Sequence, residues 1–110
     1  PLIVACNIVS WVAPPINWVK LNVDGAMTQL TQEVGCGGVI RNQKGEWILG
    51  FSQYLGICSV EEAEEWGILV GLRLAWDEGF RKVIVESDSK MVVDKILAGR
   101  DGHASSMVFL

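Results

Sequence analysis

A long apolar segment that follows a helix-start signal constrains the fold of this chain more than any other feature. Ser59 is followed three residues later by Glu62, the spacing of a capping box, in which each side chain satisfies a free backbone N–H at a helix start. We expect a helix over residues 60–78, with Gly79 as its stop. Because apolar side chains surround most of its axis, we expect this helix to be buried between layers.

Strand patterns, with alternating or β-branched apolar residues, lie on both sides of this helix. The other expected elements are a strand at 18–24, a hairpin of strands at 36–42 and 46–54 joined by residues 43–45, a strand at 82–88 and a short helix at 89–98. A strand that follows a helical crossover usually pairs in parallel with an earlier strand. The order of elements therefore predicts a mixed α/β domain.

The length and composition fit one small packed domain. The chain has 110 residues, of which 50% are hydrophobic and 20% are charged, which is too apolar for a disordered segment. We expect an N-terminal extension at residues 1–17 and a domain at 18–110, with the ordered core beginning near Trp18. The apolar stretch at 1–13 is shorter than the roughly 20 residues of a membrane span and has no basic leader, so we expect no membrane association and an excised piece of a longer protein.

The cysteines indicate the cellular compartment of the chain, and the net charge bears on whether it binds nucleic acid. Cys6, Cys36 and Cys58 are odd in number and form none of the close pairs of a zinc site, so a reducing, intracellular compartment is expected. The formal net charge of −4 argues against strong nonspecific binding to nucleic acid, which normally needs a basic face.

Three acidic residues occupy informative positions. Asp24 ends the first expected strand, where Gly25 permits a turn; Glu64 lies near the start of the long helix, and Asp88 ends the last strand. Because open α/β sheets bind ligands outside the carboxyl ends of their strands, these acids could converge at one edge. Carboxylate oxygens suit Mg²⁺ or Mn²⁺, and two such ions about 4 Å apart can activate a water and stabilise the leaving oxygen of a phosphodiester.

Each acid also has a simpler interpretation, which is favoured when it is taken singly. Asp24 could be a turn residue, Glu64 a solvated helix acid and Asp88 a cap for the following helix. The three together, in this order around strand, hairpin, helix and strand, favour a metal site.

The words Val-Asp-Gly-Ala, Ala-Glu-Glu-Trp and Glu-Ser-Asp-Ser, in that order, resemble the type 1 ribonuclease H domain, in the version found in plant retroelement-derived proteins. The matching segments are residues 18–26, 35–42, 63–79 and 83–89. The resemblance implies a ribonuclease H-like three-layer α/β fold, whose mixed sheet has an antiparallel hairpin and a parallel strand after a helical crossover. It also implies that Asp24, Glu64 and Asp88 are catalytic Mg²⁺ ligands for hydrolysis of the RNA strand of an RNA/DNA hybrid, recognised by its shape and 2′-hydroxyls.

The chain departs from the family pattern near its end and before the helix acid. The family's fifth strand, and a fourth metal-side Asp in the helix after it, have no counterpart before Leu110, so we expect a truncated C-terminal part. His103 is expected to be a loop histidine, and Val60, Glu61 and Glu62 stand where the family has polar residues that hold substrate. A catalytically inactive nucleic-acid-binding or protein-interaction module of the same fold, or one part of a larger polyprotein, therefore stays open beside the nuclease.

Several other features have ordinary interpretations. Residues 35–38, Gly-Cys-Gly-Gly, lack the ending of a phosphate loop, so close backbone packing in a strand is expected. The tryptophans with apolar neighbours, which are expected to fill the core, are Trp47, Trp66 and Trp76. The cations to be tested for contact with phosphates are Arg41, Lys44, Arg81, Lys82 and Lys90.

Overall fold

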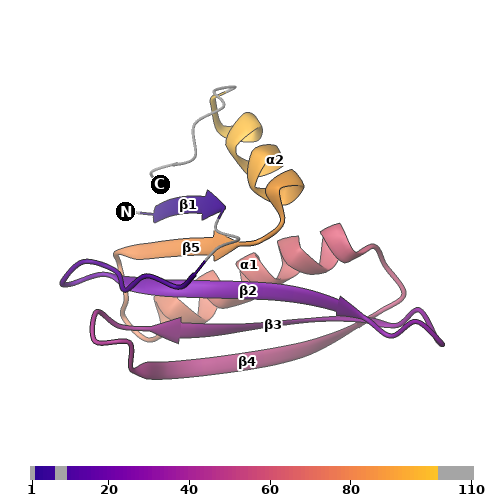
Figure 1. Cartoon of the computed structure of the whole chain (residues 1–110), viewed down its shortest axis with the longest axis horizontal. Coiled ribbons are helices and arrows are strands. Elements are labelled where there is room, and N and C mark those ends of the chain that lie inside the picture. The colour runs from indigo at the N-terminus through magenta and orange to yellow at the C-terminus, as the bar shows by residue number, and fades with distance from the viewer. Residues whose placement is uncertain (1, 7–9, 102–110) are drawn as a thin grey trace.

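The computed structural model describes residues 2–6 and 10–101 of the chain. The elements, in chain order, are β1 (Leu2–Cys6), β2 (Val19–Met27), β3 (Val34–Arg41), β4 (Trp47–Gly56), α1 (Val60–Asp77), β5 (Val83–Ser87) and α2 (Lys90–Asp101). Figure 1 shows the strands side by side in one sheet, with α1 behind it. No helix among the described residues is both long enough and apolar enough to cross a membrane.

The sheet is mixed, as the sequence predicts. Its strand order is β1-β5-β2-β3-β4. β2, β3 and β4 pair antiparallel, whereas β5 pairs in parallel with both β2 and β1. The turn between β3 and β4 contains Gly45 at a φ of 77°, a conformation that glycine adopts without strain. The expected hairpin and the parallel strand after a helical crossover are both confirmed.

The N-terminal strand β1 is a feature that the sequence did not predict. Leu2 and Val4 are buried, and Leu2 lies opposite Val83 in the parallel pairing with β5. The prediction that the ordered core begins near Trp18 is therefore wrong, because the two prolines before Trp18 interrupt the chain without preventing an earlier edge strand. The division into an extension and a domain stays a prediction, although β1 extends the sheet across that boundary.

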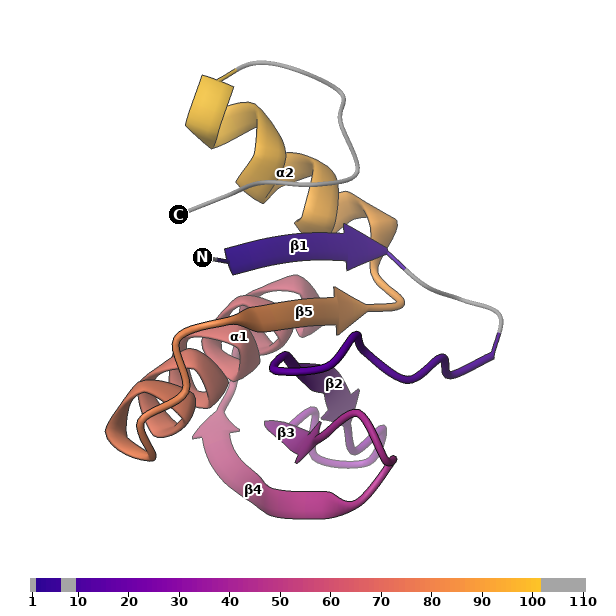
Figure 2. The same ribbon diagram turned by 90° about the vertical axis from the view of Figure 1, so that its left-hand side faces the viewer.

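One apolar core joins the sheet to both helices. Leu21 and Val85 from the sheet, Ile68 from α1, and Val92 and Val93 from α2 belong to the same buried cluster. The helices therefore pack on one side of the sheet, and Figure 2 shows the segment before β2 on the side opposite α1. Within the described residues the helices form a single layer, so the third layer that the resemblance implies is not seen in this part of the chain.

The tryptophans of α1 and β4 are more exposed than the sequence predicts. Trp47, Trp66 and Trp76 are between 50% and 66% exposed, so the prediction that they fill the core is wrong, as is that of a helix buried between layers. The buried side of α1 instead carries small residues at four-residue spacing, namely Ala63, Gly67, Gly71 and Ala75. Because these residues let the helix approach the sheet closely, Trp66 and Trp76 lie on its exposed side.

The capping box at the start of α1 is confirmed. Ser59 Oγ accepts a hydrogen bond from the Glu62 N–H at 3.0 Å, and Glu62 Oε1 accepts one from the Ser59 N–H at 3.4 Å. At the other end, Gly79 has a φ of 91°, in agreement with its predicted role as the stop.

Replacing Ser59 by Ala is expected to lower the free energy of unfolding by about 1 kcal/mol, because one backbone N–H at the helix start loses its acceptor. Urea denaturation measures this loss. Ser59→Asp is the matched control, since it keeps an acceptor and should retain most of the stability. Equal losses in both variants would contradict the capping role.

Two element boundaries differ from the prediction. β2 continues through Gly25 to Met27, so Asp24 lies inside a strand rather than at its exit. The reason is that β3 pairs with β2 along this whole stretch, which carries the extended backbone past Gly25. α2 continues through Gly99 to Asp101 instead of ending at Gly99.

The glycines of β3 pack closely, as expected. A Cβ at Gly38 would lie 2.6 Å from the ring of Phe51, and one at Gly37 would lie 3.2 Å from the Phe51 carbonyl oxygen. These glycines therefore serve the packing of β3 against β4, and the interpretation as a phosphate loop is not needed.

Candidate metal centre

The three acids singled out in the sequence lie together. Asp24 from β2, Glu64 from α1 and Asp88 from the β5–α2 junction offer carboxylate oxygens that all lie within 4.8 Å of one another. Asp24 and Asp88 are exposed, whereas Glu64 is buried. The group is thus open to solvent on one side and closed on the other by a buried carboxylate.

The acids converge because β2 is longer than its neighbour β5. β5 ends at Ser87, while β2 continues to Met27, which leaves a notch in the sheet beside the end of β5. α1 starts close to this notch because Gly25 has no side chain: a Cβ there would lie 3.1 Å from the Ala63 Cβ. This close approach brings Glu64 to the notch from the helix side.

Glu64 is held by hydrogen bonds at both of its oxygens. Oε1 accepts a hydrogen bond from the Gly25 N–H at 2.7 Å, and Oε2 accepts one from the Ser87 hydroxyl at 2.9 Å. Ser87 Oγ in turn accepts a hydrogen bond from the Ser89 N–H at 3.1 Å. Sequence reasoning missed Ser87, although it lies in the Glu-Ser-Asp word directly before Asp88.

Burial raises the pKa of Glu64 above its ordinary value. The hydrogen bonds from Gly25 and Ser87 lower this pKa, and the nearby charges of Asp24 and Asp88 raise it further. Three carboxylates in contact repel one another, and a divalent cation among their oxygens would relieve this repulsion. Such a set of oxygen ligands fits Mg²⁺ or Mn²⁺.

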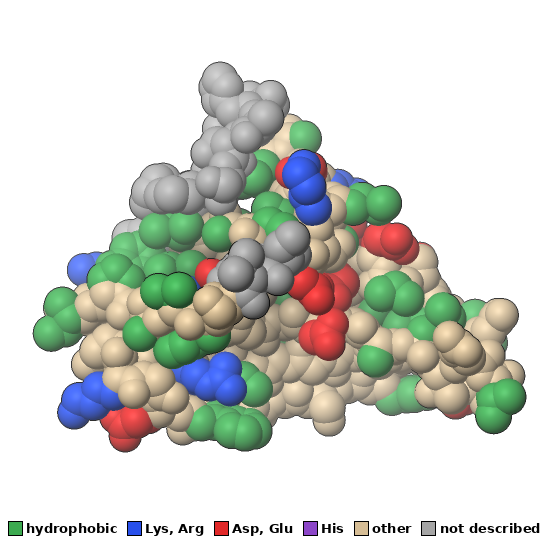
Figure 3. Space-filling view, in the orientation of Figure 1, with side chains coloured by type: hydrophobic (Ala, Val, Ile, Leu, Met, Phe, Trp, Pro, Cys, Tyr) green, Lys and Arg blue, Asp and Glu red, His purple; other side chains and the backbone are tan. Residues whose placement is uncertain are grey.

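An open trough begins at the candidate metal centre. It has a volume of about 540 Å³ and extends from Asp24 across β3 to β4. Gly35 and Gly37 line it on β3, and Ser52 and Tyr54 line it on β4. Figure 3 shows acidic side chains near the middle of this face of the molecule and basic ones toward its left end. A ligand in the trough would therefore lie beside a carboxylate rather than beside a cation.

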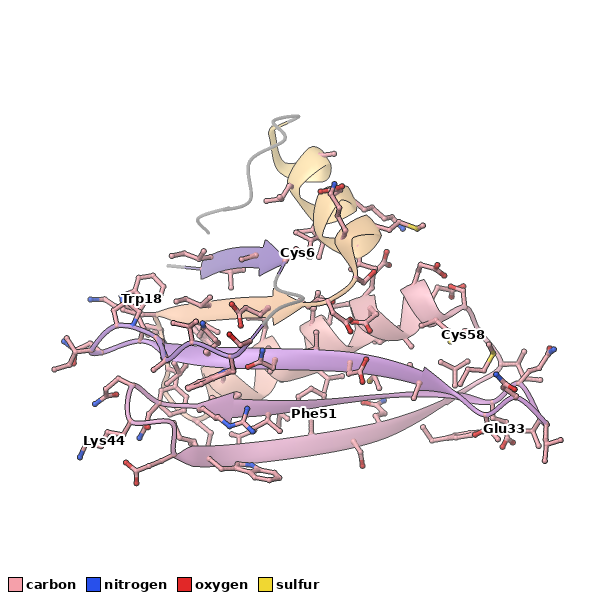
Figure 4. The ribbon with its side chains drawn as sticks, in the orientation of Figure 1. Cys6, Trp18, Glu33, Lys44, Phe51 and Cys58 are labelled. Carbon is pink, nitrogen blue, oxygen red and sulfur yellow. The ribbon has the colours of Figure 1, made fainter. Side chains whose placement is uncertain are left out.

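Most of the cations named for testing against phosphates lie away from the acids. Arg41 of β3 lies opposite Lys20 of β2 in the strand pairing, near the start of β2. Lys44 lies in the turn between β3 and β4, and Cys58 lies at the other end of the sheet (Figure 4). Arg81 and Lys82 precede β5, whereas Asp88 follows it. Of these five cations, Lys90 is the one near the acids in the chain, and its Nζ pairs with Asp94 at 2.6 Å.

Cys36 lacks the features of a reactive thiol. Cys36 is buried against Val34 and Ala63. Burial raises the pKa of the Cys36 thiol, which keeps it protonated and unreactive at neutral pH. Cys6 and Cys58 are partly buried, and all three cysteines are free.

Comparison with known sequences identifies a family and a relative of this chain. The sequence model of the reverse transcriptase-like family matches residues 22–108. A protein of Arabidopsis thaliana named "Putative ribonuclease H protein" is 38% identical over 103 residues, which cover 93% of this chain and 17% of that protein. The chain therefore spans less than a fifth of the length of this relative.

Solved structures of RNase H1 domains share the fold. RNase H1 of the archaeon Halobacterium salinarum superimposes with a TM-score of 0.68 at 22% identity, over 79% of this chain and 66% of that one. The N-terminal RNase H domain of a Mycobacterium tuberculosis protein gives 0.67 at 26%, over 80% and 63%. LC11-RNase H1, solved in complex with an RNA/DNA hybrid, gives 0.66 at 21%, over 79% and 64%.

Proposed function

The chain belongs to the reverse transcriptase-like family, and we propose that it is a metal-dependent endonuclease that hydrolyses the RNA strand of RNA/DNA hybrids. The observation that carries this proposal is the convergence of Asp24, Glu64 and Asp88, whose oxygens lie within 4.8 Å of one another. Three separate elements supply these acids around the notch in the sheet. Such a set is suited to divalent ions and to phosphoryl chemistry without a protein nucleophile.

The carboxylates of the chain would hold two Mg²⁺ or Mn²⁺ ions. When bound, such ions lower the pKa of a water for attack on phosphorus and stabilise the leaving oxygen. Glu64 is fixed through Gly25 and Ser87, so its oxygens are oriented before any ion arrives. Asp24 and Asp88 are exposed and would face the phosphate backbone. Carboxylates that are oriented in advance can hold ions where charge develops during cleavage of a phosphodiester.

The fold and the charge of the site support an RNA/DNA hybrid as the substrate. LC11-RNase H1, which shares the fold, was solved with an RNA/DNA hybrid. The net charge of −4 does not exclude such a partner here, because bound divalent ions would supply the positive charge that the acids lack. The free cysteines support an intracellular setting, in which such hybrids occur.

A catalytically inactive nucleic-acid-binding or protein-interaction module of the same fold is the second candidate. Four of the five cations named for testing lie away from the acids, which favours it, since phosphate binding usually depends on Lys and Arg. Glu61 and Glu62, in the first turn of α1, add two further acids at the end of the helix that carries Glu64. The same metal centre could then bind ions without productive contact to a phosphodiester.

Cleavage of a labelled RNA/DNA hybrid, with Mg²⁺ and then with Mn²⁺, distinguishes the two candidates. The wild-type protein should cleave the RNA strand, and Asp24→Asn should cleave it about 10³-fold more slowly, since loss of a metal ligand removes several kcal/mol of transition-state stabilisation. Asp77→Asn, an exposed acid at the end of α1, is the matched control and should retain activity. No cleavage by folded wild-type protein with either metal would refute the nuclease and leave the binding module.

A further inference from the structure

A buried polar cluster lies on the sheet beside the candidate metal centre and has no part in the proposed chemistry. Lys20 of β2 and Glu86 of β5 are 5% and 7% exposed, and their Nζ and Oε2 atoms are 3.2 Å apart. Asn22 Nδ2 donates a hydrogen bond to Glu86 Oε1 at 3.2 Å. Because side chains alternate along a strand, Lys20 and Asn22 share a sheet face with Asp24 of β2, and Asp88 follows Glu86 by two residues, just after β5 ends.

The segment before β2 closes this cluster. We call residues 10–17 the strap, because they cross the sheet on the side opposite α1. Trp11 Nε1 donates a hydrogen bond to Asn22 Oδ1 at 3.0 Å, and Lys20 Nζ donates one to the Val12 carbonyl oxygen. The Trp11 ring centroid also lies 5.7 Å from Lys20 Nζ. One chain of polar contacts thus runs from the strap to β2 and on to β5.

Stability alone does not account for this cluster. A buried ion pair generally contributes little net stability, because desolvation of both charges offsets their attraction, and apolar residues of similar size often serve as well. A hydrogen-bonded ion pair does fix geometry, since it fits one arrangement of its two strands. The Lys20–Glu86 contact therefore specifies how β2 and β5 lie beside each other.

That geometry matters most at the notch. The pairing of β2 with β5 ends at Val23 and Ser87, so no ladder hydrogen bonds hold the two strands together at Asp24 and Asp88. The carboxylates at these positions repel each other before cations bind. The contact of Asn22 with Glu86, one residue pair before the end of the pairing between β2 and β5, opposes this repulsion.

We propose that Lys20, Asn22 and Glu86, closed by the strap, are positioning residues that hold Asp24 and Asp88 at the separation that divalent ions need. This inference rests on the metal site of the proposed function but not on cleavage. It assigns the strap a role in metal binding, although the strap carries no metal ligand. The polar cluster acts through the two strands that present the acids.

Calorimetric titration of the metal-free protein with Mn²⁺ tests this role. The variant Lys20→Met/Glu86→Leu replaces the ion pair by apolar side chains of similar size, so its urea midpoint should stay close to that of wild type. Its affinity for Mn²⁺ should fall about tenfold or more, as for other residues that orient metal ligands. Lys95→Met/Glu65→Leu makes the same chemical change at a more exposed ion pair, between α2 and α1, and should keep wild-type affinity.

A second variant covers the case in which the double variant does not fold. Trp11→Phe removes the N–H that binds Asn22 and keeps an aromatic ring over Lys20, and it should bind Mn²⁺ several-fold more weakly at an unchanged urea midpoint. If Lys20→Met/Glu86→Leu folds and binds Mn²⁺ with wild-type affinity, the positioning role is overturned. If Trp11→Phe alone folds, wild-type affinity in that variant overturns it. A wild-type protein that binds no Mn²⁺ would overturn it together with the metal site. Binding without cleavage would overturn the nuclease and leave this inference standing.

Discussion

Replacing Glu64 by Gln is expected to slow cleavage strongly and to stabilise the metal-free protein at neutral pH. The Gln side chain keeps the shape of Glu64: its oxygen can accept the hydrogen bond from the Gly25 N–H, and its amide can donate to Ser87 Oγ. The fold contacts are therefore retained while one negative charge is removed from the metal centre. Cleavage should fall about 10³-fold, because a metal ligand is lost.

The stability effect follows from the direction of the Glu64 pKa. Burial raises this pKa, so the folded protein holds the Glu64 proton to a higher pH than the unfolded chain does. Below the unfolded pKa both states are protonated, and burial of the carboxyl carries no charge penalty. As the pH rises through the raised pKa, the folded state must bury a carboxylate and stability is lost. The advantage of Glu64→Gln should therefore be absent in acid and grow toward neutral pH.

Thermal unfolding in the presence of a chelator, from acidic to neutral pH, measures this difference. Glu61→Gln is the matched control, since Glu61 is an exposed acid in the first turn of the same helix. That variant should lose a few tenths of a kcal/mol, because an acid near a helix N-terminus is favourable. Saturating Mn²⁺ should stabilise wild type and not Glu64→Gln, which reverses their order. A metal-free Glu64→Gln protein less stable than wild type at neutral pH would contradict the prediction.

Local sequence patterns were sufficient to place the main elements and to nominate the acids of the candidate metal centre. The capping box at Ser59 and the stop at Gly79 depend on neighbouring residues, and both are found as predicted. The helix-to-strand order then determines which strand ends meet at one edge of the sheet. For that reason the sequence also predicted that Asp24, Glu64 and Asp88 could converge, although their metal-binding role stays a proposal.

Features that depend on distant pairings could not be predicted in this way. Lys20 and Asn22 have the pattern of an ordinary polar strand face, and Lys20 is buried because it meets Glu86 and the strap. Asn22 binds Glu86, which lies 64 residues farther along the chain. The side of α1 that meets the sheet could not be predicted either. An apolar pattern around the whole axis does not show that glycines, rather than tryptophans, contact the sheet. β1 was missed because a short edge strand has only five residues of pattern.

Replacing Leu21 by Ala is expected to cause the largest loss of stability of any substitution considered. Leu21 is 0% exposed and lies in the main core cluster, at the contact between β2 and α1. Its truncation removes buried apolar surface and leaves a cavity, at an expected cost of about 2–5 kcal/mol in the free energy of unfolding. Leu30→Ala is the matched control, because Leu30 is 98% exposed and should change stability by less than about 0.5 kcal/mol. Urea denaturation of both variants measures the difference.

Gly71 of α1, which lies against Leu21, allows a second test of this contact. A Cβ at Gly71 would lie 2.5 Å from Leu21 Cδ2, so Gly71→Ala alone should overpack the contact and cost about 1–3 kcal/mol. In the double variant Leu21→Ala/Gly71→Ala, the new methyl group would enter the space left by the Leu side chain. The double variant should then be at least about 1 kcal/mol more stable than the sum of the single losses predicts.

Additive losses in this cycle would contradict the view that the contact between Leu21 and Gly71 sets the distance from β2 to α1. That distance also bears on the candidate metal centre, because Asp24 projects from β2 and Glu64 from α1. If the contact sets it, Gly71→Ala should weaken Mn²⁺ binding although Gly71 lies two helical turns from Glu64, and the double variant should recover part of the affinity. Loss of stability with unchanged Mn²⁺ affinity would show that the notch is held by the sheet alone.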